Sequence, residues 1–250
     1  RVILSPGDTE QRALVGAQNS NWDTGHGRDG SSDVTLGAAI QAQRVTQARK
    51  SGANYVITRG VLAYDFRTVD LPGHIRIVRT QLVVGGTATA AGDTNGNKLK
   101  IGVITNPTNA GEVSIAVTDY DLARYDANSY TSAQTVANSS NNIVVNLDNR
   151  VLLNHLQNAI NRREVLHLGL RNELDFLDDA SGVTGTNRVW FSPPSAQGGS
   201  FGAATLSKLH IFYRIISNLR NTGGRDAGGV ASAGFCAGNT FGGTNSGFGS

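Results

Sequence analysis

Alternating apolar and polar positions run through the middle of the chain and predict β-strands. The clearest pattern covers residues 59–84, where one alternating run ends at Phe66, Leu71-Pro72-Gly73 follows, and a second run begins at Ile75. Proline presets a turn φ and glycine takes conformations that other residues resist, so the segment predicts two strands joined by a turn. We expect Tyr64 and Phe66 to face the core and Arg76 to face solvent.

Similar runs recur along the chain and define the expected fold. They predict strands at residues 55–66, 75–84, 98–105, 113–119, 142–147, 165–170, 188–191 and 206–216. One helix is predicted over residues 148–163 because apolar residues recur there at helical spacing after a capping Asp or Asn, whereas residues 41–50 fit a helix or a strand. The expected fold is all-β: an antiparallel, jelly-roll-like two-sheet sandwich with one short lid helix and extended terminal arms.

The order of these elements resembles that of a known kind of domain. A Tyr64-Asp65-Phe66 strand before Leu71-Pro72-Gly73 resembles the DNRLRE type of β-sandwich module, which is similar to carbohydrate-binding modules of secreted and cell-surface proteins. The predicted helix before the strand that begins near Glu164 resembles the later part of such modules. The resemblance spans about residues 30–216 and implies a β-sandwich used at an extracellular surface.

Composition changes at both ends of the predicted sandwich. Residues 1–30 are turn-rich after a short apolar run, and residues 217–250 are rich in glycine with little charge. Such segments bury too little to form a core of their own, so we expect an arm (1–30), a sandwich domain (31–216) and a tail (217–250). Both ends are expected to join subunits of an assembly. The predicted assembly contacts are Val2, Ile3, Leu4, Trp22, Phe235, Phe241 and Phe248.

Charge and cysteine content narrow the expected partners. Charged residues make up only 16% of the chain, the formal net charge is +3, and no Lys or Arg cluster is interleaved with aromatic residues. This pattern gives little support to nucleic-acid binding, and without an apolar run of roughly 18 residues no membrane insertion is expected. The single cysteine, Cys236, excludes an intramolecular disulfide framework.

One acidic stretch is a candidate calcium site. Asp119, Asp121 and Asp126 lie within eight residues of one another, and calcium prefers carboxylate and carbonyl oxygens from flexible loops. The full EF-hand spacing is absent, and a solvated acidic turn paired with Arg124 explains the same residues. We expect no other cofactor.

Three tyrosines on the same stretch are the candidate sugar-binding patch. Tyr120, Tyr125 and Tyr130 are spaced by five, and aromatic faces stack on the apolar faces of sugars. Local hydrogen bonding at loop edges is the alternative role. These residues carry the second functional hypothesis, a carbohydrate-binding module of a secreted or surface protein that takes a surface polysaccharide.

Catalytic chemistry has little support in the sequence. The histidines lack metal-ligand spacing, and nothing singles out a carboxylate pair among Glu112, Glu164 and Glu173. We therefore expect a non-catalytic structural subunit of an extracellular, cell-surface or virion assembly, such as a filament, fibre or capsid decoration. Its subunits are expected to associate as a homo-oligomer, or with other assembly subunits, through the terminal arms.

Overall fold

A computed structural model describes the chain at residues 1–4, 11–16, 18–30, 33–36, 46–72, 74–84, 98–135, 143–183, 186–189 and 208–216. The chain divides into two compact units, Arg1–Arg214 and Ile215–Ser250. Of the second unit only residues 215 and 216 are described. No helix in the described ranges is long and apolar enough to cross a membrane.

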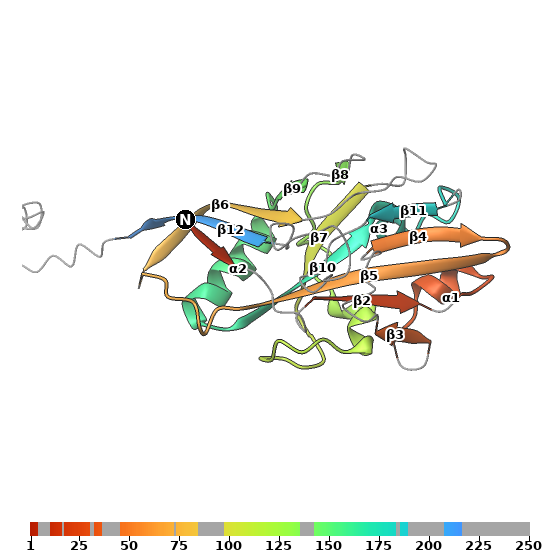
Figure 1. Ribbon diagram of the computed structural model, residues 1–250, viewed down its shortest axis with the longest axis horizontal. Helices are drawn as coiled ribbons and strands as arrows, with labels where there is room; N and C mark the ends of the chain where they lie inside the picture. Colours follow the sequence, from red (N-terminus) through yellow and green to blue (C-terminus); the bar gives the residue numbers. More distant parts are fainter. Residues whose placement is uncertain are drawn as a thin grey trace, which may run out of the picture. The chain divides into compact units, whose positions relative to one another are not determined.

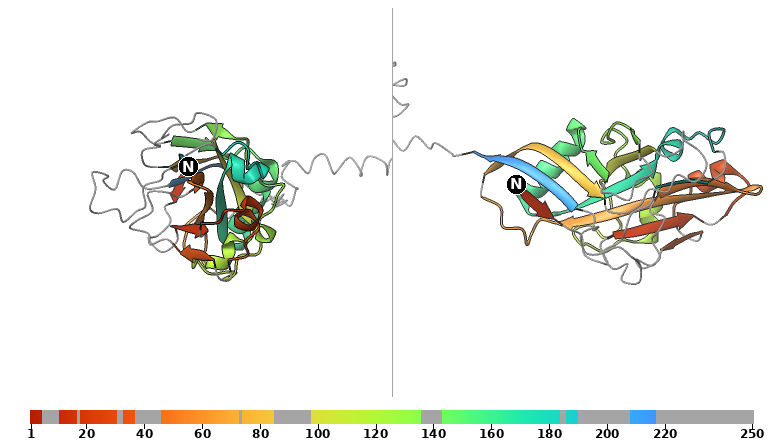
Figure 2. Two further views of the ribbon diagram at one scale, coloured as in Figure 1. Left: turned by 90° about the vertical axis from the view of Figure 1, so that its right-hand side faces the viewer. Right: turned by 45° about the horizontal axis from the view of Figure 1, so that its top comes forward.

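Sheet A is the smaller of two antiparallel sheets. Its described strands run in the order β1 (Val2–Leu4), β12 (Lys208–Ile215), β6 (Ile75–Val84) and β9 (Ile143–Asn146). Figure 2 shows β12 between β6 and the N-terminal strand. The first and last strands of the unit are therefore neighbours, with Ile3 paired to His210.

Sheet B is larger and is organised around one long strand. Its described path is β11 (Thr186–Val189), β4 (Thr46–Ser51), β5 (Asn54–Asp65), β10 (Val165–Asn172), β7 (Lys98–Ile104) and β8 (Gln134–Thr135). In addition, β2 (Gln11–Gly16) pairs with β5 and with β3 (Val34–Leu36). The early part of β5 pairs with β4 and its later part with β10, while β2 lies along the opposite side (Figure 1).

The first hydrophobic core lies between the two sheets. Leu62 and Tyr64 of β5 pack there with residues of β6, β7, β10 and β12. Helix α2 (Arg150–Arg162) adds its apolar face, and the side chain of Asn149 caps it by accepting from two backbone N–H groups. Gln157 of α2 accepts from Ile77 N at 2.8 Å and donates to Ile75 O at 3.0 Å, so the helix binds the start of β6.

A second core covers the other face of sheet B. It is closed by two short helices, α1 (Trp22–His26) and α3 (Glu173–Leu177), and by a loop with the 3₁₀ turns η2 (Val117–Tyr120) and η3 (Leu122–Arg124). Strand β5 supplies both cores through alternation, because Val61 faces the second core while Leu62 faces the first. Sheet B is therefore buried on both faces near its centre.

The all-β, two-sheet sandwich predicted from the sequence is confirmed, and Tyr64 and Phe66 are core residues at 1% exposure each. The strand predicted at residues 113–119 is wrong. Asp119 instead accepts hydrogen bonds from the backbone N–H groups of Thr108 and Ala116, and such local bonds compete with strand pairing. The ambiguous stretch 41–50 contains strand β4 from Thr46 onward.

Part of the predicted N-terminal arm belongs to the sandwich. The backbone of residues 2–4 pairs with β12, that of residues 11–15 pairs with β5, and α1 packs on the second core. These residues were expected to form an irregular arm because they are turn-rich, but their short apolar runs complete the two sheets. The tail at residues 217–250 lies outside the described residues.

Candidate functional site

The strongest polar arrangement is a buried ionic cluster made by Arg59, Arg171 and Asp175. Arg59 comes from β5, Arg171 from β10 and Asp175 from α3, and the three are 0%, 5% and 0% exposed. Arg59 donates to the two Asp175 carboxylate oxygens at 3.0 and 2.7 Å, and Arg171 Nε donates to Oδ2 at 2.7 Å. One carboxylate thus neutralises part of the charge of two guanidinium groups inside the protein.

The cluster is also anchored to backbone and to an aromatic ring. Arg59 donates to the carbonyl oxygens of Tyr120 at 2.6 Å and His26 at 2.8 Å. Its guanidinium carbon lies 4.1 Å from the centroid of the Tyr120 ring. Arg171 also donates to the backbone oxygen of Asp175. The hydrogen bonds of this one cluster therefore connect β5, β10, α1, α3 and η2.

The electrostatics of the cluster keep all three groups charged. Burial is the largest influence on Asp175 and raises its pKa, but Arg171 and Arg59 together outweigh it and hold the pKa well below its usual range. Burial lowers the pKa of Arg59, but Asp175 and nearby groups outweigh it, and the net shift is upward. A carboxylate held ionised in this way cannot exchange protons near neutral pH, so the cluster is suited to structure rather than to acid–base catalysis.

His26 and Asp178 form the rim of this cluster. The indole Nε1 of Trp22 donates to Asp178 Oδ1 at 2.6 Å, and His26 Nδ1 lies 3.2 Å from the same oxygen. Trp22 is 5% exposed and stacks on His26, with ring centroids 5.8 Å apart. Trp22, predicted as an assembly contact, is therefore buried within the protein's own second core.

The three tyrosines of the predicted sugar patch are buried and present no open platform. Tyr120, Tyr125 and Tyr130 are 0%, 7% and 6% exposed. Burial raises the pKa of Tyr120 and of Tyr130 to about 12, so both phenols stay neutral. Sequence spacing could not show that the loop folds inward, because the surface that receives the rings belongs to sheet B.

A pair of glycines makes room for two of these rings. Gly169 of β10 lies opposite Gly102 of β7 in the strand register. A Cβ on Gly169 would overlap the Tyr125 ring, and one on Gly102 would lie 2.9 Å from Tyr130 Cε1. The two tyrosine rings stack with an interplanar angle of 8°. Glycine is required at both positions because the rings lie directly on the backbone.

The aspartates predicted to bind calcium are used separately in local structure. Asp119 is buried and binds the backbone at Thr108 and Ala116. Asp121 accepts from Ala123 N at 2.9 Å, and Asp126 accepts from Asn128 N at 2.9 Å while its other oxygen lies 3.0 Å from His155 Nε2. No group of three or more His, Cys, Asp or Glu within the described ranges is arranged to hold a metal ion.

A cleft of about 640 Å³ opens between α2 and the adjoining ends of β7 and β10. Its polar lining includes His155, Asn158, Arg162, Glu164 and His167. His167 is 2% exposed, and burial lowers its pKa. The cleft offers hydrogen-bonding groups, but its lining contains no Trp, Tyr or Phe, so it lacks the stacking face that was expected of a sugar site.

The predicted assembly contacts at the N-terminus lie in β1. Val2 packs against the first core, Leu4 is buried in it at 9% exposure, and Ile3 faces outward at 42% exposure. Phe235, Phe241 and Phe248 lie outside the described residues. Seven large hydrophobic side chains are exposed in the described part, and five of them lie on sheet A or directly after it: Ile3, Val78, Val144, Ile215 and Ile216.

Sequence reasoning missed the buried ionic cluster, although one signal for it is present. Arg59 interrupts the apolar run of β5, and a charged residue inside such a run is seldom buried unless it is paired. Its partner Asp175 stands 116 positions away, so only the fold reveals the pair. No protein-family model matches the chain, and no curated protein matches it significantly.

Proposed function

We propose that the protein is a non-catalytic structural subunit of an extracellular or virion surface assembly, such as a filament, a fibre or a capsid decoration. The single observation that carries this proposal is the incomplete edge of β12. Strand β1 pairs only with Leu209–Ile211, so the same edge of β12 from Phe212 onward has no partner strand in the described part. An unpaired edge of this kind accepts a strand from another chain.

The side chains around this edge support the same proposal. Ile215 and Ile216 are 64% and 47% exposed at the point where the chain enters its Gly- and Phe-rich tail. Contact with a neighbouring subunit would bury these aliphatic groups and offset the entropy lost when a glycine-rich segment becomes ordered. The proposed joint therefore combines the open edge of β12 with the tail of an adjacent subunit.

The buried polar chemistry of the unit is consistent with a structural role. Its most strongly perturbed carboxylate, Asp175, is enclosed by two guanidinium groups, and the tyrosines first considered for sugar binding are interior groups. The extracellular location rests on the resemblance noted from the sequence. The same fold hosts many functions, so the test must address assembly itself.

Size-exclusion chromatography with light scattering tests the proposal. Deleting residues 217–250 should leave the circular dichroism spectrum of the sandwich unchanged and convert the oligomer to monomer. Replacing Phe235, Phe241 and Phe248 together by Ala should cause most of the same loss, because buried aromatics dominate contacts of this kind. A monomeric full-length chain, or an oligomer that survives the deletion, would reject the joint.

A matched pair of point variants locates the contact. Ile215→Glu should weaken the oligomer because it puts charge at the open edge of β12. Leu177→Glu on α3 is the control, since Leu177 is similarly exposed at 57% but lies away from sheet A. Equal effects of the two variants would show that the edge of β12 is not the contact.

A further inference from the structure

The outward face of sheet A carries side chains that alternate with its core residues. On β12, Leu209, Ile211 and Tyr213 pack on the first core. Successive side chains of a strand point to opposite faces, so Phe212 and Arg214 with their like-facing neighbours Lys208 and His210 point outward. On β6, Ile75 and Ile77 pack inward and Arg76 between them is exposed. Arg79 is exposed as well, and its contact with Phe212 places it on the outward face although it does not follow the alternation of Ile75 and Ile77.

The charged side chains on the described strands of this sheet are all positive. Its cations come from three separate parts of the chain: Arg1, Arg76, Arg79, Lys208 and Arg214. None of the described strands of sheet A contains Asp or Glu. These five cations outnumber the formal net charge of +3 of the whole chain.

An aromatic ring lies among these cations. The guanidinium carbon of Arg79 lies 4.9 Å from the centroid of the Phe212 ring, and that of Arg1 lies 5.9 Å from it. A guanidinium group held over a ring keeps N–H groups on its edge for anionic oxygens. The exposed side chains of Ile3, Val78 and Val144 add apolar surface on the same sheet.

We propose that the outward face of sheet A binds single-stranded nucleic acid. The cations match a phosphate backbone, while Phe212, the stacked guanidinium groups and the exposed aliphatic side chains offer surfaces to unpaired bases. A duplex hides its base faces, and an anionic polysaccharide has no flat aromatic face. Both therefore fit a surface of cations, an aromatic ring and aliphatic side chains less well than a single strand does. The cations stand far apart in the sequence, which explains why no basic cluster was visible there and why no nucleic-acid partner was expected.

Fluorescence anisotropy with the full chain and a labelled deoxythymidine oligonucleotide tests the proposal. With about 20 nucleotides at about 50 mM salt, binding should be measurable, and log K should fall with log salt at a slope of about −3 for four phosphate contacts. The double variant Arg76→Glu/Arg79→Glu should weaken binding at least about tenfold and flatten this slope. A uridine oligonucleotide should behave similarly, because the recognition uses phosphates and base faces.

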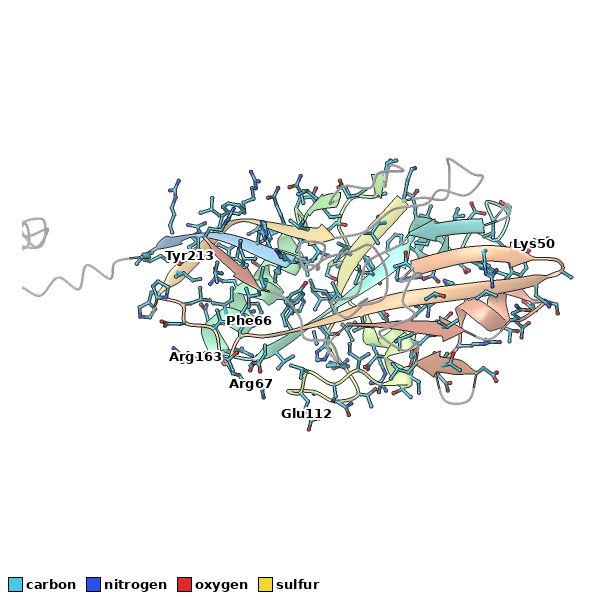
Figure 3. All side chains as sticks on the ribbon, viewed as in Figure 1. Lys50, Phe66, Arg67, Glu112, Arg163 and Tyr213 are labelled. Carbon is cyan, nitrogen blue, oxygen red and sulfur yellow. The ribbon has the colours of Figure 1, made fainter. Side chains whose placement is uncertain are left out.

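Two further variants make the test specific. Lys50→Glu is the control for charge reversal away from sheet A. Lys50 is an exposed cation of β4 whose Nζ lies 5.4 Å from the Tyr55 ring centroid, and the variant should bind the oligonucleotide as tightly as the wild type. Figure 3 shows Lys50 at the opposite end of the unit from Tyr213 of β12. Phe212→Leu should weaken binding of the oligonucleotide and leave binding of an abasic oligonucleotide of equal charge unchanged. Circular dichroism checks that each variant is folded.

Three results would overturn the proposal. The first is no anisotropy change at low salt, and the second is equal weakening by Lys50→Glu and the double variant. The third is binding of the abasic oligonucleotide or heparin as tightly as the thymidine oligonucleotide, which would make the face a general polyanion surface such as one for an anionic polysaccharide. Because this test concerns the face of the sheet and not the edge of β12, it can fail while the assembly proposal stands.

Discussion

Replacing Asp175 by Asn should be among the most damaging single changes in the protein. The carboxylate is fully buried and accepts from Arg59 and Arg171 at 2.7 to 3.0 Å. Asn preserves the shape of the side chain but removes its charge. Two buried guanidinium groups would then share no counter-ion, so the folded state would carry the cost of their lost hydration.

The expected magnitude follows from the number of charges left unpaired. Removing one partner of a buried ion pair costs about 3–5 kcal/mol, and here one removal strands two cations, so we expect about 5 kcal/mol. Domains are commonly stable by only about 5–15 kcal/mol, so the variant would be near the limit of folding. Its melting temperature should fall by roughly 10–20 °C.

Urea unfolding followed by circular dichroism measures this loss. Asp65→Asn is the control, because the Asp65–Arg67 ion pair has side chains that are 21% and 49% exposed and should contribute little. A second variant that replaces Arg59, Arg171 and Asp175 together by Met, Met and Leu should recover much of the loss, since no charge remains buried. A loss below about 1 kcal/mol for Asp175→Asn would refute the argument.

Asp175 should also make the stability of the protein depend on pH. Because the pKa of Asp175 is lower in the folded protein than in the unfolded chain, its contribution to stability is full above the ordinary aspartate pKa. The contribution declines as pH falls below that value, since the unfolded chain then binds the proton more readily. The stability of wild type should therefore drop on acidification below about pH 4, and that of Asp175→Asn should drop less.

Three smaller predictions follow from other contacts. Gly169→Ala should cost about 1–3 kcal/mol in urea unfolding because its Cβ would overlap the Tyr125 ring; an unchanged midpoint would contradict the close packing. Phe66→Ala should cost about 3–5 kcal/mol and Arg76→Ala within about 0.5 kcal/mol, and equal losses would contradict their assignment to opposite faces. Burial lowers the pKa of His167, so wild-type stability should fall as pH drops below about 6.5, and His167→Gln should weaken that fall; identical pH profiles would rule out His167 as the cause.

Local pattern predicted the parts of the fold that depend on neighbouring residues. The strand predicted at residues 75–84 coincides with β6, and the helix predicted at 148–163 contains α2 with Asn149 as its cap. Alternation also placed Tyr64 and Phe66 in the core correctly. In each case a few consecutive side chains carry the information, because strand and helix periodicity are short-range properties.

Long-range contacts decided the features that the sequence did not reveal. Tyr120 was expected at the surface as part of a sugar-binding patch, but its ring packs on the buried guanidinium group of Arg59. Its hydroxyl donates to the backbone oxygens of Gly25 and Ile57. Trp22 was expected in an arm, yet its indole binds Asp178, which is 156 positions away. The partners of Tyr120 and Trp22 cannot be inferred from local composition, because each partner is distant in the sequence and only the strand order of sheet B brings it close.

Strand β5 contributes side chains to both cores, so the two cores should unfold together. This strand sends Leu62 and Tyr64 into one core and Ile57 and Val61 into the other, and it pairs with three other strands. Neither core can come apart without breaking the ladder that serves the other. Backbone amides of β5 should thus exchange with deuterium only through global opening, so that both faces of the sandwich form one cooperative unit instead of two separately fluctuating halves.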